Sequence, residues 1–173
     1  MRYVELRRHT DADGDDLTAR GVADAEAIGR EGLHPPYALF VSSGAVRATR
    51  TAVILRHACG QDESPVLEVS GLRSSVEDRW RAAGEAAGKG ATVEGIRGVD
   101  PDLVDHEERL LGGAVRRVVE SLPEGGRALA IGHSPMIEAA VAGLTGRAVE
   151  PLTKGAGVLL VEDGGRYAVR PLQ

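Results

Sequence analysis

The sequence predicts an α/β fold in a single domain. Segments of strand character alternate along the chain with segments of helical periodicity, which is the pattern of α/β domains. The 173 residues suit one domain and can bury a core without disulfides or structural metal. No internal repeat and no linker divides the chain, so residues 1–173 are expected to fold as one unit.

The first strand is expected over residues 2–8. Val4 and Leu6 lie on one face of it, because side chains alternate along a strand. Glu5 and Arg7 share the other face, which is unusual for a strand that a parallel sheet buries on both sides. We expect these two opposite charges to neutralise each other.

Helices and strands then alternate up to residue 69. The expected elements are a helix at 17–31, a strand at 37–41, a helix at 45–57 and a strand at 65–69. Helical spacing assigns their inward side chains as Val22, Ala25 and Ile28 in the first helix, and Val46, Val53 and Ile54 in the second.

The segment that follows is the least regular part of the chain. Five glycines break residues 84–98 into a loop-like stretch, and residues 72–105 are expected to form a small, irregular, cap-like segment that carries substrate specificity. Beyond it we expect a helix at 102–121, a strand at 127–131, a helix at 135–144 and a hairpin of strands at 157–161 and 167–169.

Composition excludes several classes of function. There are 21 basic and 26 acidic residues, so the net charge of −5 argues against a nucleic-acid partner. No stretch approaches the roughly 18 apolar residues of a membrane span, and the N-terminus lacks a secretory signal. Cys59 is the only cysteine, so no internal disulfide or multi-cysteine zinc site forms. We expect a cytoplasmic protein with no membrane or nucleic-acid partner.

Three strand-to-helix junctions bring reactive side chains to one edge of the predicted sheet. Arg8 and His9 end the first strand, Arg47 follows the second, and His133 and Ser134 follow the strand at 127–131. Ligands of open α/β sheets bind beyond the carboxyl ends of the strands. The convergence of these three junctions predicts a ligand site there.

The residue types at these junctions suit a phosphoryl group. Two histidines and two arginines without a carboxylate cluster are poor ligands for a metal. An imidazole nitrogen can attack phosphorus, arginines can pair with the phosphoryl oxygens, and the helix after Ser134 directs backbone N–H groups toward an anion. His34, His57 and His106 lie outside the junctions and are expected to be exposed and passive.

At these junctions the sequence resembles the histidine phosphatase superfamily, which is related to phosphoglycerate mutases. Order and spacing agree over nearly the whole chain, and its short length resembles the bacterial phosphohistidine phosphatases of the superfamily. The resemblance implies a three-layer sandwich with a mostly parallel central sheet and helices on both faces. The matching segments are Leu6-Arg7-Arg8-His9-Thr10, Leu17-Thr18-Ala19-Arg20-Gly21, Ser42 to Ala52, and Gly132-His133.

The resemblance also implies roles for individual residues. His9 would be the nucleophile that becomes phosphohistidine, and Arg8, Arg47 and His133 would clamp the phosphoryl group, with no metal or organic cofactor. Thr10 stands where the family usually has glycine, and its hydroxyl is expected to bind the phosphate together with Ser134, the first residue after His133.

The general acid is the least defined residue. Many members of the family place a glutamate in a Leu-x-Glu context, whereas this chain has Leu72-Arg73-Ser74. Glu77 is the candidate acid and Asp78 the next nearest, although both equally suit the start of a solvated helix. A site without a dedicated acid favours a weakly basic leaving group, such as the imidazole of phosphohistidine with its pKa of about 6.5.

These observations predict a metal-independent phosphohydrolase that works through phosphorylated His9. Its substrate would be a small phosphomonoester or a phosphohistidine protein. One alternative is a non-catalytic phosphate- or phosphoprotein-binding module, supported by the missing acid and by Thr10. Another is a phosphomutase, which would need a sealed cap that the short, glycine-rich segment at 84–98 is not expected to provide.

Overall fold

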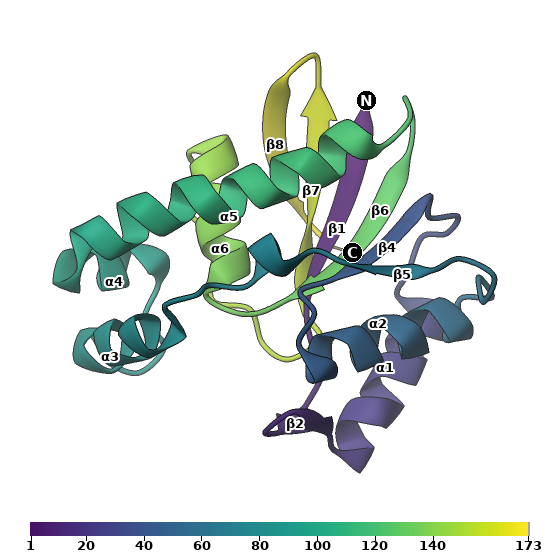
Figure 1. Cartoon of the computed structure of the whole chain (residues 1–173), viewed down its shortest axis with the longest axis horizontal. Coiled ribbons are helices and arrows are strands. Elements are labelled where there is room, and N and C mark those ends of the chain that lie inside the picture. Colours follow the sequence, from purple (N-terminus) through teal and green to yellow (C-terminus); the bar gives the residue numbers. More distant parts are fainter. Residues whose placement is uncertain (173) are drawn as a thin grey trace.

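A six-stranded sheet forms the centre of the computed structural model, which describes residues 1–172 (Figure 1). The strands lie in the order β5–β4–β6–β1–β7–β8, and the first four of these run parallel. β7 pairs antiparallel with β1, and β8 antiparallel with β7. The prediction of a mostly parallel sheet is confirmed. The strands are β1 (Arg2–Arg8), β4 (Leu39–Ser42), β5 (Val66–Glu68), β6 (Arg127–Gly132), β7 (Gly157–Asp163) and β8 (Arg166–Pro171).

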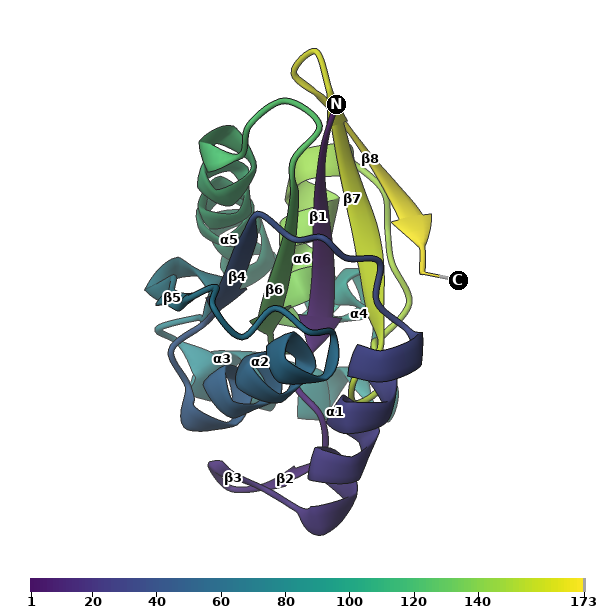
Figure 2. The same ribbon diagram turned by 90° about the vertical axis from the view of Figure 1, so that its right-hand side faces the viewer.

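Helices cover both faces of this sheet, as expected of a three-layer sandwich (Figures 1 and 2). Phe40, Leu129 and Ile131 point from the strands toward α1 and α2, whereas Val4 and Leu6 point toward α5 and α6. Across residues 1–172, every helix falls short of the length or the apolar character that crossing a bilayer requires. The four flanking helices are α1 (Ala19–Glu31), α2 (Val46–Ala58), α5 (Pro101–Ser121) and α6 (Met136–Thr145).

The two charges of β1 neutralise each other, as predicted. Arg7 Nε donates to Glu5 Oε1 at 2.6 Å, and the Tyr37 hydroxyl donates to Glu5 Oε2 at 2.6 Å. The two Nη atoms of Arg7 donate to the carbonyl oxygens of Gly155 and Gly32. Every charged atom of this buried pair therefore has a partner, which is the condition for burying charge in a sheet. The arginine also ties the loop before β7 to the end of α1.

The predicted inward face of α2 is wrong for two of its three residues. Val46 is 53% exposed and Val53 is 38% exposed, while Ile54 is partly buried against the core. The buried face consists instead of Ala48, Thr51, Ala52 and Leu55. Small side chains are needed there because α1 packs closely: a Cβ on Gly29 of α1 would lie only 2.4 Å from the Cβ of Ala58.

The segment predicted to be loop-like at residues 84–98 is largely helical. It contains the end of α3 (Glu77–Ala87) and all but the last residue of α4 (Val93–Val99), preceded by the short 3₁₀ helix η1 (Ser70–Leu72). Packing outweighs the helix-breaking tendency of the glycines, because Trp80 and Ile96 are buried in the main core. We call α3 and α4 the cap helices.

A small hairpin precedes α1, between the strand expected at 2–8 and the helix expected at 17–31. β2 (Ala12–Asp13) pairs antiparallel with β3 (Asp16–Leu17), separate from the main sheet. Thr18 then caps α1, its hydroxyl accepting from the backbone N–H of Gly21 at 3.0 Å. The hairpin therefore lies directly after His9 in the chain, and its turn projects from the carboxyl edge of the sheet (Figure 2).

Candidate active site

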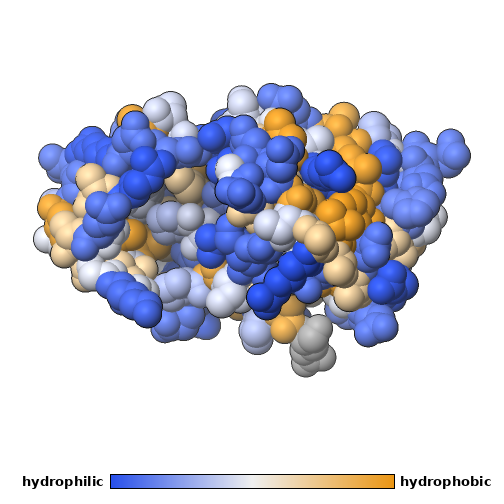
Figure 3. Space-filling view, turned by 90° about the horizontal axis from the view of Figure 1, so that it is seen from below, coloured by the Kyte–Doolittle hydropathy of each residue, from blue (hydrophilic) through white to orange (hydrophobic). Residues whose placement is uncertain are grey.

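A cavity of about 510 Å³ lies at the carboxyl edge of the sheet, beyond β1, β4 and β6. Figure 3 views the molecule from this edge and shows a surface hollowed left of centre. The cavity is lined by all but one of the residues that the sequence analysis selected, namely Arg8, His9, Arg47, Glu77, His133 and Ser134. The exception is Thr10.

His9 presents an unprotonated ring nitrogen. Its Nδ1 lies 2.8 Å from the carbonyl oxygen of Thr10, and because a carbonyl oxygen only accepts, Nδ1 carries the proton. Nε2 therefore keeps its lone pair and lies 3.3 Å from Nε of Arg47. Burial lowers the pKa of His9 to about 4, against the hydrogen bond to Thr10, which raises it. The imidazole is neutral at pH 7 and competent as a nucleophile.

His133 faces His9 with ring centroids 5.3 Å apart. Its Nε2 lies 2.7 Å from the hydroxyl of Ser43, and its Nδ1 lies 3.4 Å from Nη2 of Arg47. Burial, followed by the charge of Arg47, lowers the pKa of His133 to about 3. Ser43 belongs to the matched segment after β4 but carried no role in the sequence analysis, and here it orients this second imidazole.

Arg47 links the two histidines to the β2–β3 hairpin. Besides its contacts with His9 and His133, its Nη1 donates to Asp15 Oδ1 at 2.8 Å. Asp15 lies in the hairpin turn, and its side chain is 64% exposed. Sequence patterns alone could not single out this carboxylate, because a polar turn of several aspartates does not show which of them reaches the site.

Arg8 is fixed by the loop between α6 and β7. Its Nη1 donates to the carbonyl oxygen of Leu152 at 2.8 Å, while its Nε is buried and has no hydrogen-bond partner within residues 1–172. Glu138 Oε1 accepts from the backbone N–H of Leu152 and from the hydroxyl of Ser134. Burial raises the pKa of Glu138, and the charge of Arg8 opposes this rise. The Ser134 hydroxyl is thus engaged with Glu138 rather than free for a ligand.

Thr10 is placed away from the cavity. It is fully buried, and both its backbone nitrogen and its hydroxyl lie within hydrogen-bond distance of the Thr51 hydroxyl, at 3.3 and 3.4 Å. The structure therefore does not bring the Thr10 side chain to the ligand site, and the expectation that it binds phosphate has no geometric support.

The cavity is cationic, and Lys154 is a residue that the sequence analysis missed. Arg8, Arg47, Arg81 and Lys154 line it, against the single carboxylate of Glu77. Burial and the neighbouring Arg8 lower the pKa of Lys154. Within residues 1–172, no three His, Cys, Asp or Glu side chains cluster as a metal site. An anion is the ligand that this lining fits.

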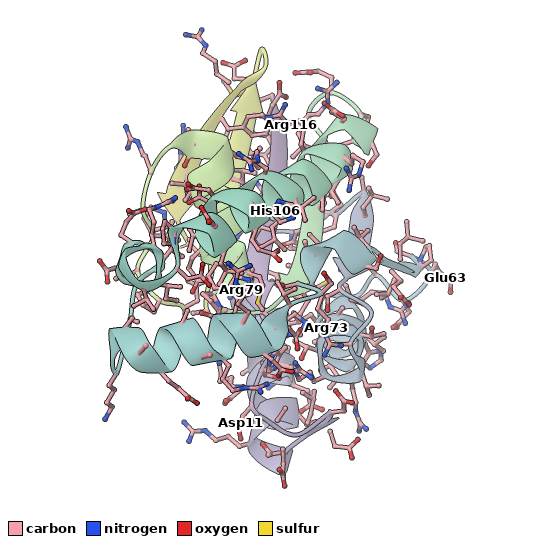
Figure 4. The ribbon with its side chains drawn as sticks, turned by 60° about the vertical axis from the view of Figure 1, so that its left-hand side comes forward. Asp11, Glu63, Arg73, Arg79, His106 and Arg116 are labelled. Atoms are coloured by element: carbon pink, nitrogen blue, oxygen red, sulfur yellow. The ribbon has the colours of Figure 1, made fainter. Side chains whose placement is uncertain are left out.

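Glu77 lines the cavity from the first turn of α3. The Arg73 guanidinium donates to its carboxylate, and this hydrogen bond holds the pKa of Glu77 below its usual range. Figure 4 shows Arg73 between α3 and α2. Asp78 points outward with a side chain that is 95% exposed. Ser74, which occupies the expected glutamate position, donates to the buried Glu107.

The histidines outside the junctions are exposed, as expected. His57 lies 2.8 Å from Asp62 on the surface, and His34 is exposed after α1. His106 lies on α5, where it is exposed (Figure 4), and it does not line the cavity.

Solved structures with the same architecture exist. A phosphoglycerate mutase from Bacillus anthracis str. Sterne superposes with a TM-score of 0.76 at 19% identity, over 98% of this chain and 91% of that one. A phosphoserine phosphatase from Entamoeba histolytica gives 0.72 at 15% identity, over 98% and 95%. A mycobacterial glucosyl-3-phosphoglycerate phosphatase in complex with inorganic phosphate gives 0.67 at 19% identity, over 98% and 96%.

The chain has the histidine phosphatase fold. No protein-family model matches the sequence, and no curated protein matches it either. At 15–19% identity the likeness concerns the fold, so the reaction has to come from the side chains. In this histidine phosphatase fold, the carboxyl edge of the sheet brings together Arg8, His9, Arg47 and His133.

Proposed function

We propose that this chain is a metal-independent phosphohydrolase of the histidine phosphatase superfamily, which acts through a phosphohistidine formed on His9. The observation that carries the proposal is the neutral imidazole of His9, whose Nε2 accepts a hydrogen bond from Arg47 Nε at 3.3 Å in a cationic cavity. A binding module has no use for a nucleophile held in this state. The substrates are phosphorylated molecules with a good leaving group.

The reaction has two displacements. In the first, Nε2 of His9 attacks phosphorus, the N–P bond forms, and the bond from phosphorus to the leaving atom breaks with its electron pair departing on that atom. Arg8, Arg47 and Lys154 offset the charge on the equatorial oxygens. In the second, water attacks phosphorus, the N–P bond breaks, and inorganic phosphate leaves together with the proton that the water gives up.

His133 is the second imidazole of the phosphoryl site. Its Nδ1 accepts from Arg47 while Nε2 is hydrogen-bonded to Ser43. Because the Ser43 hydroxyl can both donate and accept, the proton of His133 can move to Nδ1 and be donated to a phosphoryl oxygen. We assign His133 this stabilising role in both displacements.

The leaving group is expected to be weakly basic. A general acid must carry a proton at the working pH, whereas the pKa of Glu77 is held low by Arg73. Glu77 is therefore a carboxylate at pH 7 and a poor proton donor, although it is the only acidic residue that lines the cavity within the described chain. Substrates whose leaving atom needs no prior protonation suit such a site.

The test is hydrolysis of para-nitrophenyl phosphate in the presence of EDTA. We expect phosphate release in the wild type and none in His9→Ala. His57→Ala is the matched control, because Arg56-His57 repeats the Arg-His dipeptide on the surface and should retain full activity. Loss of activity on adding EDTA, or full activity in His9→Ala, would contradict the mechanism. No turnover in any variant would favour the binding module.

A further inference from the structure

The cavity extends from the phosphoryl site to the cap helices. Glu77, Trp80, Arg81 and Gly84 occupy positions i, i+3, i+4 and i+7 along α3, so they share one face of that helix. All four line the cavity, and Ile96 of α4 lines it as well. The cavity therefore has two parts, a phosphoryl part at the sheet edge and a part bounded by the cap helices, which we call the cap subsite.

Apolar residues outnumber the charged ones in the cap subsite, where Glu77 and Arg81 are the charged members. Trp80, Ala91, Ile96 and Met136 line it together with glycines, in contrast to the arginines and histidines of the phosphoryl part. Its one cation, Arg81, has a side chain that is 66% exposed and donates to the carboxylate of Asp78 on the surface. The whole cavity, at about 510 Å³, is within the range of roughly 300–1,000 Å³ that encloses small organic ligands.

Gly84 has no structural reason to be glycine. It lies inside α3 with an ordinary helical backbone, where glycine destabilises a helix relative to alanine. A Cβ added there would meet only Cδ1 of Ile96, at 4.0 Å, which is an ordinary contact. Gly29 of α1 is different, because its Cβ would clash with Ala58 at 2.4 Å. Because Gly84 has no side chain, the part of the cavity beside Ile96 stays open.

We propose that the cap subsite binds the organic part of a small phosphomonoester with a compact, largely apolar leaving group, and that Gly84 sets the size limit of that group. The proposal rests on the proposed function and narrows it to small molecules. A phosphohistidine on a protein surface is the disfavoured substrate, because the cap helices bound the space that the carrier protein would have to occupy.

Binding of a substrate analogue tests the subsite without requiring turnover. Phenylphosphonate carries a phosphoryl group and an apolar ring joined by a C–P bond that phosphatase chemistry does not break. Trp80 is the only tryptophan in the chain, so its fluorescence reports directly on the cap subsite. We expect phenylphosphonate to bind the wild type at least tenfold tighter than inorganic phosphate, as measured by calorimetry, and to change the Trp80 emission.

Gly84→Leu should fill the subsite and spare the phosphoryl part. We expect it to weaken phenylphosphonate at least tenfold and to leave the Kd of inorganic phosphate within twofold. Gly98→Leu is the matched control, since Gly98 lies in α4, is exposed, and has no atom within 4 Å of an added Cβ. Gly84→Ala is the conservative variant, with an expected rise in Tm and a smaller loss of phenylphosphonate affinity.

Two outcomes would overturn the proposal. One is phenylphosphonate binding no tighter than phosphate to the wild type. The other is that Gly84→Leu changes the Kd values of phenylphosphonate and inorganic phosphate by the same factor. If the leucine variant does not fold, the same comparison is made with Gly84→Ala. Failure of the proposed function would look different: no turnover dependent on His9, with the preference for phenylphosphonate and its dependence on residue 84 retained.

Discussion

Replacing Arg7 with methionine should destabilise the fold strongly. Methionine keeps much of the volume and apolar stem of arginine but leaves the Glu5 carboxylate, which is 0% exposed, with only the Tyr37 hydroxyl as a partner. It also removes the hydrogen bonds to Gly155 and Gly32. Removing one partner of a buried ion pair costs about 3–5 kcal/mol, because an uncompensated charge stays buried.

The assay is thermal and urea unfolding of the wild type and Arg7→Met. For a chain of this size each kcal/mol shifts Tm by about 2–4 °C, so a fall of roughly 6–20 °C is expected. The double variant Glu5→Gln, Arg7→Met should recover most of the loss, because glutamine still accepts from Tyr37 and no charge remains. A loss below about 1 kcal/mol in Arg7→Met, or a double variant less stable than the single one, would refute this account of the pair.

Three further predictions concern the site. Because the pKa values of His9 and His133 are lowered to about 4 and about 3, the unfolded chain binds more protons than the folded chain below pH 6.5. The free energy of unfolding should therefore fall as the pH drops from 6.5 toward 4. Urea titrations at several pH values should show a smaller fall in a His9→Gln, His133→Gln variant. Asp15→Asn should free Arg47 and tighten phosphate binding by about two- to fivefold in low salt, since half-exposed ion pairs contribute up to about 1 kcal/mol; unchanged or weaker binding in calorimetry would contradict this. Ser43→Ala should lower kcat for para-nitrophenyl phosphate about two- to tenfold, the equivalent of one hydrogen bond, and should also lower Tm, because Nε2 of the buried His133 loses its partner; an unaffected kcat would rule out the orienting role of Ser43.

The phosphoryl site could be assembled from the sequence because parallel strands share one carboxyl edge. Arg8, His9 and His133 follow directly from β1 and β6, which are neighbours in the sheet, and Arg47 begins the helix after β4. Their positions depend on local strand–turn–helix geometry, which short motifs encode. The fold class followed from the same alternation of elements.

Residues that reach the site through loops could not be found in this way. Lys154 and Asp15 depend on the course of a long irregular segment and of a polar turn, which tertiary contacts determine. Lys154 could have been found from the direction of β7. Because β7 runs antiparallel to β1, the loop before β7, which contains Lys154, lies at the carboxyl edge of the parallel strands. The cap helices could not be predicted, because the glycines of residues 84–98 lower helix propensity and only tertiary packing buries Trp80 and Ile96.

The backbone hydrogen bonds of Leu152 have a consequence for engineering this chain. Its N–H donates to Glu138 of α6 and its carbonyl accepts from Arg8 at the end of β1, so the backbone of this one residue ties Arg8 to α6. The preceding residues, 146–148, are exposed and belong to no helix or strand. Insertions at 146–148 should therefore be tolerated, whereas a single added residue at 152–155 would shift the register of Arg8 against the phosphoryl site.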